Sequence, residues 1–121
     1  MQNQSLLAGP EQLEALRTLR SVDKFLPEVL YPGAPTEEIR HEAEKIINQL
    51  LDKLILGLPA DPQKQFVMSQ FKNALSDFEH ADTEERERFC GYLEEIMDIT
   101  GIQSSDGLLN NWLYGFDPNN P

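Results

Sequence analysis

The feature that most constrains the fold is a long segment between Thr36 and Gly57 whose apolar residues recur at the spacing of an α-helix. Apolar residues three or four positions apart share one helical face. The members of this stripe are Ile39, Ala43, Ile46, Ile47, Leu50, Leu51 and Leu54. Leu51, Ile55 and Leu56 widen the face, and so wide an apolar surface requires contact on several sides. The sequence therefore predicts a central helix that starts at a Thr36 cap and stops at Gly57.

Proline and glycine divide the rest of the chain into further segments with helical spacing. Pro10 suits the first position of a helix, and Pro27 breaks that helix or restarts it. Asp61 is expected to cap the helix that follows the central one, which buries apolar residues as far as Phe78. No segment alternates between apolar and polar residues as a half-buried strand would, so the sequence predicts an all-α fold.

Two more helices are expected in the last third of the chain. Asp82 and Glu85 have the spacing of a capping box, which predicts the start of a fourth helix ending at Gly101. A short C-terminal helix should begin near Ser104 and close at Gly115. The predicted architecture is a single compact domain of four main helices plus this short fifth one.

The chain has 121 residues, which allows one domain and leaves little room for two. We expect a flexible N-terminus over residues 1–9, the helical domain over 10–116 and a frayed tail over 117–121. The first residues lack the cationic and apolar regions of a signal peptide, so we expect a cytoplasmic protein. There, the lone Cys90 would stay reduced.

Acidic residues dominate the charge of the chain and exclude several classes of partner. The formal net charge is −11, so the surface repels the phosphates of nucleic acids and of anionic membranes. The imbalance lies in residues 74–121, where the only basic residues apart from histidine are Arg86 and Arg88. A solvated acidic face that maintains solubility is the simpler interpretation of such a charge pattern.

The fourth predicted helix carries its acids on the face opposite its apolar stripe. The residues that we expect to bind a partner there are Glu87, Gly91, Glu94, Glu95 and Asp98. Glu94 and Asp98 are like charges one turn apart near the helix C-terminus, and Gly91 costs about 1 kcal/mol relative to alanine. Three unfavourable choices on one face suggest a role other than stability. Close packing of another helix against Gly91 is an equally good explanation for that glycine.

Residues suited to catalysis or metal binding are scarce. The chain lacks a phosphate-binding loop, a nucleophile elbow and a zinc protease motif, and Cys90 lies at the edge of an apolar stripe. Glu38 with His41, and Asp77 with His80, repeat the acid-x-x-His spacing of di-iron bundle proteins. Both pairs point away from the predicted core, so we assign no catalytic, metal or cofactor residue.

Aromatic residues are dense near the C-terminus, at Trp112, Tyr114 and Phe116. The favoured interpretation is that they cover the end of the bundle and fix the C-terminal segment. The alternative is an exposed patch beside the acidic helix, in which Tyr114 anchors a partner at the rim.

The stretch GIQSSDGLLNNWLYGF over residues 101–116, with YLEEIM over 92–97 upstream, resembles a family of small uncharacterised bacterial proteins. We take the resemblance to cover most of residues 10–117. It implies a helical domain with no established activity, and it transfers no catalytic residue. In size and charge alone, the chain is also similar to small acidic immunity proteins that neutralise toxins.

These observations favour a non-catalytic protein-binding module, an inhibitor that occludes a basic toxin with the acidic face of the fourth helix. A second hypothesis is a structural homo-oligomer in which the apolar central helix completes its core across a dimer interface. A small enzyme that uses carboxylates as acid and base ranks last. The sequence leaves a monomer and a homodimer equally open.

Overall fold

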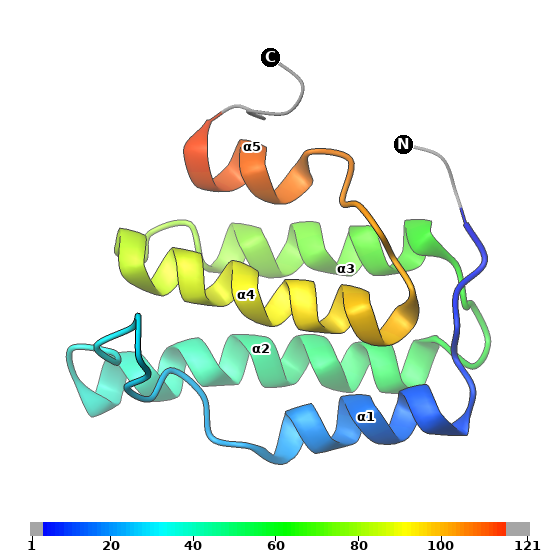
Figure 1. Cartoon of the computed structure of the whole chain (residues 1–121), viewed down its shortest axis with the longest axis horizontal. Coiled ribbons are helices and arrows are strands. Elements are labelled where there is room, and N and C mark those ends of the chain that lie inside the picture. Colours follow the sequence, from blue (N-terminus) through cyan, green and yellow to red (C-terminus); the bar gives the residue numbers. More distant parts are fainter. Residues whose placement is uncertain (1–3, 116–121) are drawn as a thin grey trace.

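A long central helix, α2 (Glu37–Gly57), organises the fold (Figure 1). The computed structural model describes residues 4–115, of which 64% are helical. The other helices are α1 (Pro10–Ser21), α3 (Lys64–Asp77), α4 (Thr83–Thr100) and α5 (Leu108–Tyr114). The described residues contain isolated bridges but no strand, so the predicted all-α fold of four main helices and a short fifth is confirmed.

The packing around α2 follows from its wide apolar face. α1, α3 and α4 all contact it, and α5 lies on the side of α4 that faces away from it (Figure 1). Leu51 and Leu54 are completely buried within the chain, whereas Leu56 is 83% exposed. Ile39, at the start of the stripe, is 41% exposed, so the predicted apolar face is buried in its middle and open at its first turn.

The helix ends were predicted with mixed success. The Thr36 hydroxyl accepts a hydrogen bond from the backbone N–H of Ile39 at 3.1 Å, and Gly101 ends α4 with φ +82°. The Asp61 cap is wrong, because α3 begins two residues further on, with Gln63 at its N-cap. The capping box is also wrong, since Glu85 is buried against another part of the chain.

The loop between α1 and α2 is fixed to the core by Phe25. Its ring is fully buried and lies 5.8 Å from the Phe78 ring and 5.1 Å from the Tyr92 ring, measured between centroids. Its backbone N–H donates to the Tyr92 hydroxyl at 2.9 Å. Phe25 has φ +60°, an unfavourable conformation for a bulky residue, so packing of the ring has to maintain it.

Lys24 is also completely buried, and it caps the C-terminus of α1. Its ammonium donates to the carbonyl oxygens of Val22 at 2.8 Å and Arg20 at 3.3 Å, which a helix end leaves without partners. Burial lowers the pKa of Lys24, and the nearby Glu44 carboxylate opposes that shift.

The segment before α1 is anchored at several points. Leu6 and Leu7 donate backbone hydrogen bonds to Pro62 and Thr100, and the Gln4 carbonyl accepts one from Lys64. We expected residues 1–9 to be flexible, and these bonds join residues 4–7 of that segment to Thr100 and to the chain around the start of α3. Residues 1–3, Phe116 and the expected tail over 117–121 lie outside the described residues.

Candidate functional site

Four of the six residues predicted to bind a partner line a single groove between α4 and α5. Glu87, Gly91 and Glu94 come from α4, and Tyr114 comes from the last turn of α5. The groove has a volume of about 270 Å³. Cys90, Leu109, Asn110 and Leu113 complete its lining. The site therefore combines two carboxylates with apolar side chains and the side chain of Tyr114.

The other two predicted residues lie outside this groove. Asp98 is exposed one helical turn beyond Glu94 on α4, but it does not contribute to the lining. Glu95 is exposed, and burial lowers the pKa of Lys24 more than the opposing charge of Glu95 raises it. Neither residue lines the groove, although Asp98 extends the acidic line of Glu87 and Glu94.

No other helix of the described chain packs closely against Gly91. A Cβ built on it would lie 2.9 Å from Nη1 of Arg88, and outside its own helix backbone and chain neighbours it would meet nothing else within 4 Å. The missing side chain makes room for the Arg88 guanidinium, which lies 3.9 Å from the Tyr92 ring centroid and 3.1 Å from Glu28. The helix-packing explanation for Gly91 is therefore wrong.

Cys90 is poorly suited to nucleophilic chemistry. It is buried, and desolvation raises the pKa of its thiol to about 12, with the Glu94 carboxylate adding to the effect. At neutral pH, the thiol is protonated and weakly nucleophilic. This residue acts as a small apolar side chain in the wall of the groove.

Trp112 attaches α5 to α4. Its indole lies 5.9 Å from the Phe89 ring, measured between centroids, and the Arg86 guanidinium lies 4.3 Å from the centroid of the indole. Arg86 also donates to the Trp112 carbonyl. Tyr114, by contrast, is 54% exposed. Near the C-terminus, Trp112 thus packs over the end of the helices as predicted, whereas Tyr114 is accessible to a partner.

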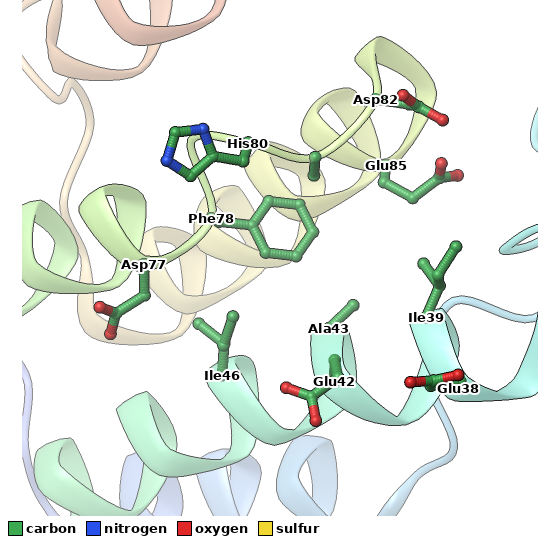
Figure 2. A pocket seen from close by; sticks show the side chains of 11 residues that line it. Glu38, Ile39, Glu42, Ala43, Ile46, Asp77, Phe78, His80, Asp82 and Glu85 are labelled. Carbon is green, nitrogen blue, oxygen red and sulfur yellow. The ribbon is translucent and has the colours of Figure 1, made fainter.

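A larger groove, which sequence reasoning missed, lies between α2 and the turn that joins α3 to α4 (Figure 2). Its volume is about 380 Å³. Apolar side chains form its floor, namely Ile39, Ala43, Ile46, Phe78 and Ala81. Ionisable side chains surround the floor, namely Glu38, Glu42, Asp77, His80, Asp82 and Glu85. The groove is thus apolar in its centre and acidic around its margin.

Glu85 is the least exposed of these acids, at 3%. Its Oε2 accepts a hydrogen bond from the Tyr31 hydroxyl at 3.0 Å, and no ion pair joins it to a basic side chain within residues 4–115. Burial and this hydrogen bond raise the pKa of the Tyr31 hydroxyl. A carboxylate so deeply buried is costly unless it is well compensated, and here a single hydroxyl provides the compensation.

The two acid-x-x-His segments meet only in part. Glu38, Asp77 and His80 all line the larger groove, whereas His41 faces another side of α2 and lies 3.5 Å from Glu37. Within the described residues, no three histidine, cysteine or acidic side chains come close enough to hold a metal ion.

No described helix is both long enough and apolar enough to cross a membrane.

An exposed apolar pair lies beside the acidic side of α4. Val29 and Leu30 are 99% and 98% exposed at the tip of a turn that Glu28 and Tyr31 close with two backbone hydrogen bonds. Leu30 shares a small groove of about 200 Å³ with Glu87 and other residues, and Glu87 also lines the α4–α5 groove. The two grooves therefore adjoin at Glu87.

Comparisons with known proteins support the fold and give no activity. A crystal structure of a DUF3571 family protein from Acinetobacter baumannii AYE has a TM-score of 0.79 and 27% sequence identity, over 86% of this chain and 89% of that one. No curated protein matches the sequence. Residues 7–117 match the model of DUF4844, a domain of unknown function. The expected resemblance to an uncharacterised helical family is thereby confirmed, and the chain belongs to the DUF4844 family.

Proposed function

We propose that the protein is a non-catalytic binding module whose acidic α4–α5 surface takes up a basic protein partner. One observation carries the proposal: Glu87, Gly91, Glu94 and Tyr114, selected from the sequence as partner-binding residues, line the same groove. In finer detail, the partner is a basic toxin, and the module is the immunity protein that occludes it within the bacterial cytoplasm.

The chemistry of the surface suits that role. Glu87 and Glu94 can each accept hydrogen bonds from a lysine or arginine of the partner, and Asp98 extends the acidic line by one turn. Tyr114 supplies an exposed aromatic ring of the kind that often contributes strongly to binding at interfaces. An acidic surface of this sort accelerates association with a basic partner and selects against acidic ones.

The test is charge reversal with a matched control. Glu94→Lys combined with Asp98→Lys should abolish capture of the partner from a lysate of the native host, as identified by mass spectrometry. Two lysines near a helix C-terminus interact favourably with the helix dipole, while a like-charge pair at i,i+4 remains, so the fold should stay intact. The control is Glu11→Lys with Asp61→Lys, which changes the net charge equally at exposed sites on other elements.

Capture by the wild type should also weaken steeply with added salt, because exposed charges are screened over about 8 Å at physiological ionic strength. If both double variants retain the same partners as the wild type, the acidic line is only a solvated face and the proposal is wrong. If both lose them equally, net charge alone accounts for capture and the groove has no specific role.

A homo-oligomer is the second candidate, and the exposure of Leu56 on α2 favours it. This residue is 83% exposed although it belongs to the widened apolar face of the central helix. Light scattering at micromolar concentration distinguishes the candidates. A single species of 13.8 kDa would exclude an obligate oligomer.

A further inference from the structure

The larger groove, between α2 and the α3–α4 turn, has an elongated apolar floor. Ile39, Ala43 and Ile46 form a row along one face of α2, and Phe78 faces this row from the turn (Figure 2). Because a helix rises about 1.5 Å per residue, the row is roughly 10 Å long. That length and its apolar character fit an extended aliphatic chain.

Carboxylates lie at both ends of this row. Glu38 and Glu85 lie near Ile39, whereas Asp77 lies near Ile46 (Figure 2). None of the residues that line the groove is a lysine or an arginine. An occupant with a positive charge at each end would therefore find carboxylates at both.

Glu85 gives an independent reason to expect a cation. Its side chain is buried in the wall of the groove, and its only hydrogen bond from a described side chain comes from the Tyr31 hydroxyl. Buried carboxylates usually have a basic partner, because desolvation of an unpaired charge is costly. The chain does not supply that partner within residues 4–115, so a ligand in the groove would complete the site.

We propose that this groove binds a linear aliphatic polyamine. Its methylene groups lie along Ile39, Ala43 and Ile46, one ammonium group faces Glu85, and a second faces Asp77. A charge at each end favours a free polyamine over a lysine side chain, which has a single ammonium group. The site is separate from the α4–α5 groove and does not depend on the function proposed for it.

Spermidine is the probe, titrated into the full chain at physiological ionic strength and followed by calorimetry and by methyl NMR. The wild type should bind one equivalent in a saturable manner, with shifts concentrated at the Ile39 and Ile46 methyl groups. Ile39→Lys places a fixed cation in the groove at a position that is already 41% exposed, and it should weaken binding at least tenfold. Leu56→Lys makes the same chemical change at an exposed site on the other end of α2, and it should bind as the wild type does.

Glu85→Gln is the second variant, because glutamine can still accept the hydrogen bond of Tyr31 while the charge is removed. It should also bind spermidine at least tenfold more weakly, with an unchanged circular dichroism spectrum. Butylamine, which has one charge, should bind the wild type at least tenfold more weakly than spermidine.

Three outcomes would overturn the proposal. Equal binding by the wild type and Ile39→Lys would show that spermidine responds only to the net charge of −11. Full affinity in Glu85→Gln would remove the reason for placing an ammonium group there. Equal affinity for butylamine and spermidine would exclude recognition of both ends.

Discussion

Replacing Tyr31 by phenylalanine isolates the one hydrogen bond that a described side chain donates to the buried Glu85 carboxylate. The substitution leaves the ring in place, so the contact with Phe25, at 6.4 Å between ring centroids, is kept. A buried acceptor without its donor costs about 1–3 kcal/mol, and more when it is charged. We therefore expect Tyr31→Phe to lower the free energy of unfolding by about 2 kcal/mol, which for a domain of this size lowers Tm by roughly 8 °C.

The assay is urea denaturation followed by circular dichroism, with an unchanged slope as the sign that only stability has changed. Tyr114→Phe is the matched control, since it removes the same hydroxyl from an exposed residue and should change the free energy by less than about 0.5 kcal/mol. The double variant Tyr31→Phe with Glu85→Met should recover most of the loss, because both polar partners are then replaced by apolar groups.

The reasoning fails if Tyr31→Phe costs no more than Tyr114→Phe. That result would mean that water entering the larger groove solvates Glu85 adequately, and it would also weaken the argument for a cation there. Failure of the double variant to recover stability would indicate instead that the Tyr31 hydroxyl acts through a contact other than the Glu85 carboxylate.

Three further predictions follow from individual residues. Gly91→Ala should change the free energy of unfolding by less than about 1 kcal/mol in urea denaturation, because the gain in helix propensity is offset by displacing the Arg88 guanidinium, whose Nη1 would lie 2.9 Å from the new Cβ, from Tyr92 and Glu28. Because burial raises the pKa of the Cys90 thiol from 9.0 to about 12, the unfolded state loses that proton first. The free energy of unfolding should thus fall between these pH values by more in the wild type than in Cys90→Ala, as pH-dependent urea melts can measure. Replacing Val29 and Leu30 by serine should leave Tm unchanged, because both side chains are almost fully exposed, and should reduce partner capture if this turn belongs to the interface.

The helices could be predicted because their signals are local. Apolar spacing marks the buried face of α2, and Thr36 and Gly101 provide caps that depend only on neighbouring residues. The two caps that were wrongly predicted, at Asp61 and at Asp82 with Glu85, lie where residues distant in sequence contact the start of the helix. At the start of α3, a backbone hydrogen bond from Lys64 to Gln4, and a bridge from Ser5 to Gln63, hold the chain that Asp61 was expected to cap.

The acidic line of α4 could be predicted for a related reason, because residues on one helical face keep their relative positions whatever surrounds them. The sequence placed Glu87, Gly91 and Glu94 together correctly. It could not show that the charge of Glu95 acts on Lys24, because that depends on where the loop before α2 lies. Membership of the α4–α5 groove is set by the fold of α5, which Trp112 and Arg86 hold in place.

The burial of Glu85 could not be predicted from the sequence, which explains why the larger groove was missed. In sequence Glu85 is one acid among many near the start of a helix, where a capping role is the natural interpretation. It accepts a hydrogen bond from Tyr31, which lies 54 residues earlier in the chain, in the loop between α1 and α2 that Phe25 fixes to the core. The acids of α4 therefore differ in kind, since those on its exposed line remain in contact with water while Glu85 has lost most of that contact. A ligand gains most from supplying a charge where water is absent, so mutation of the buried Glu85 is more informative than mutation of the exposed acids of α4.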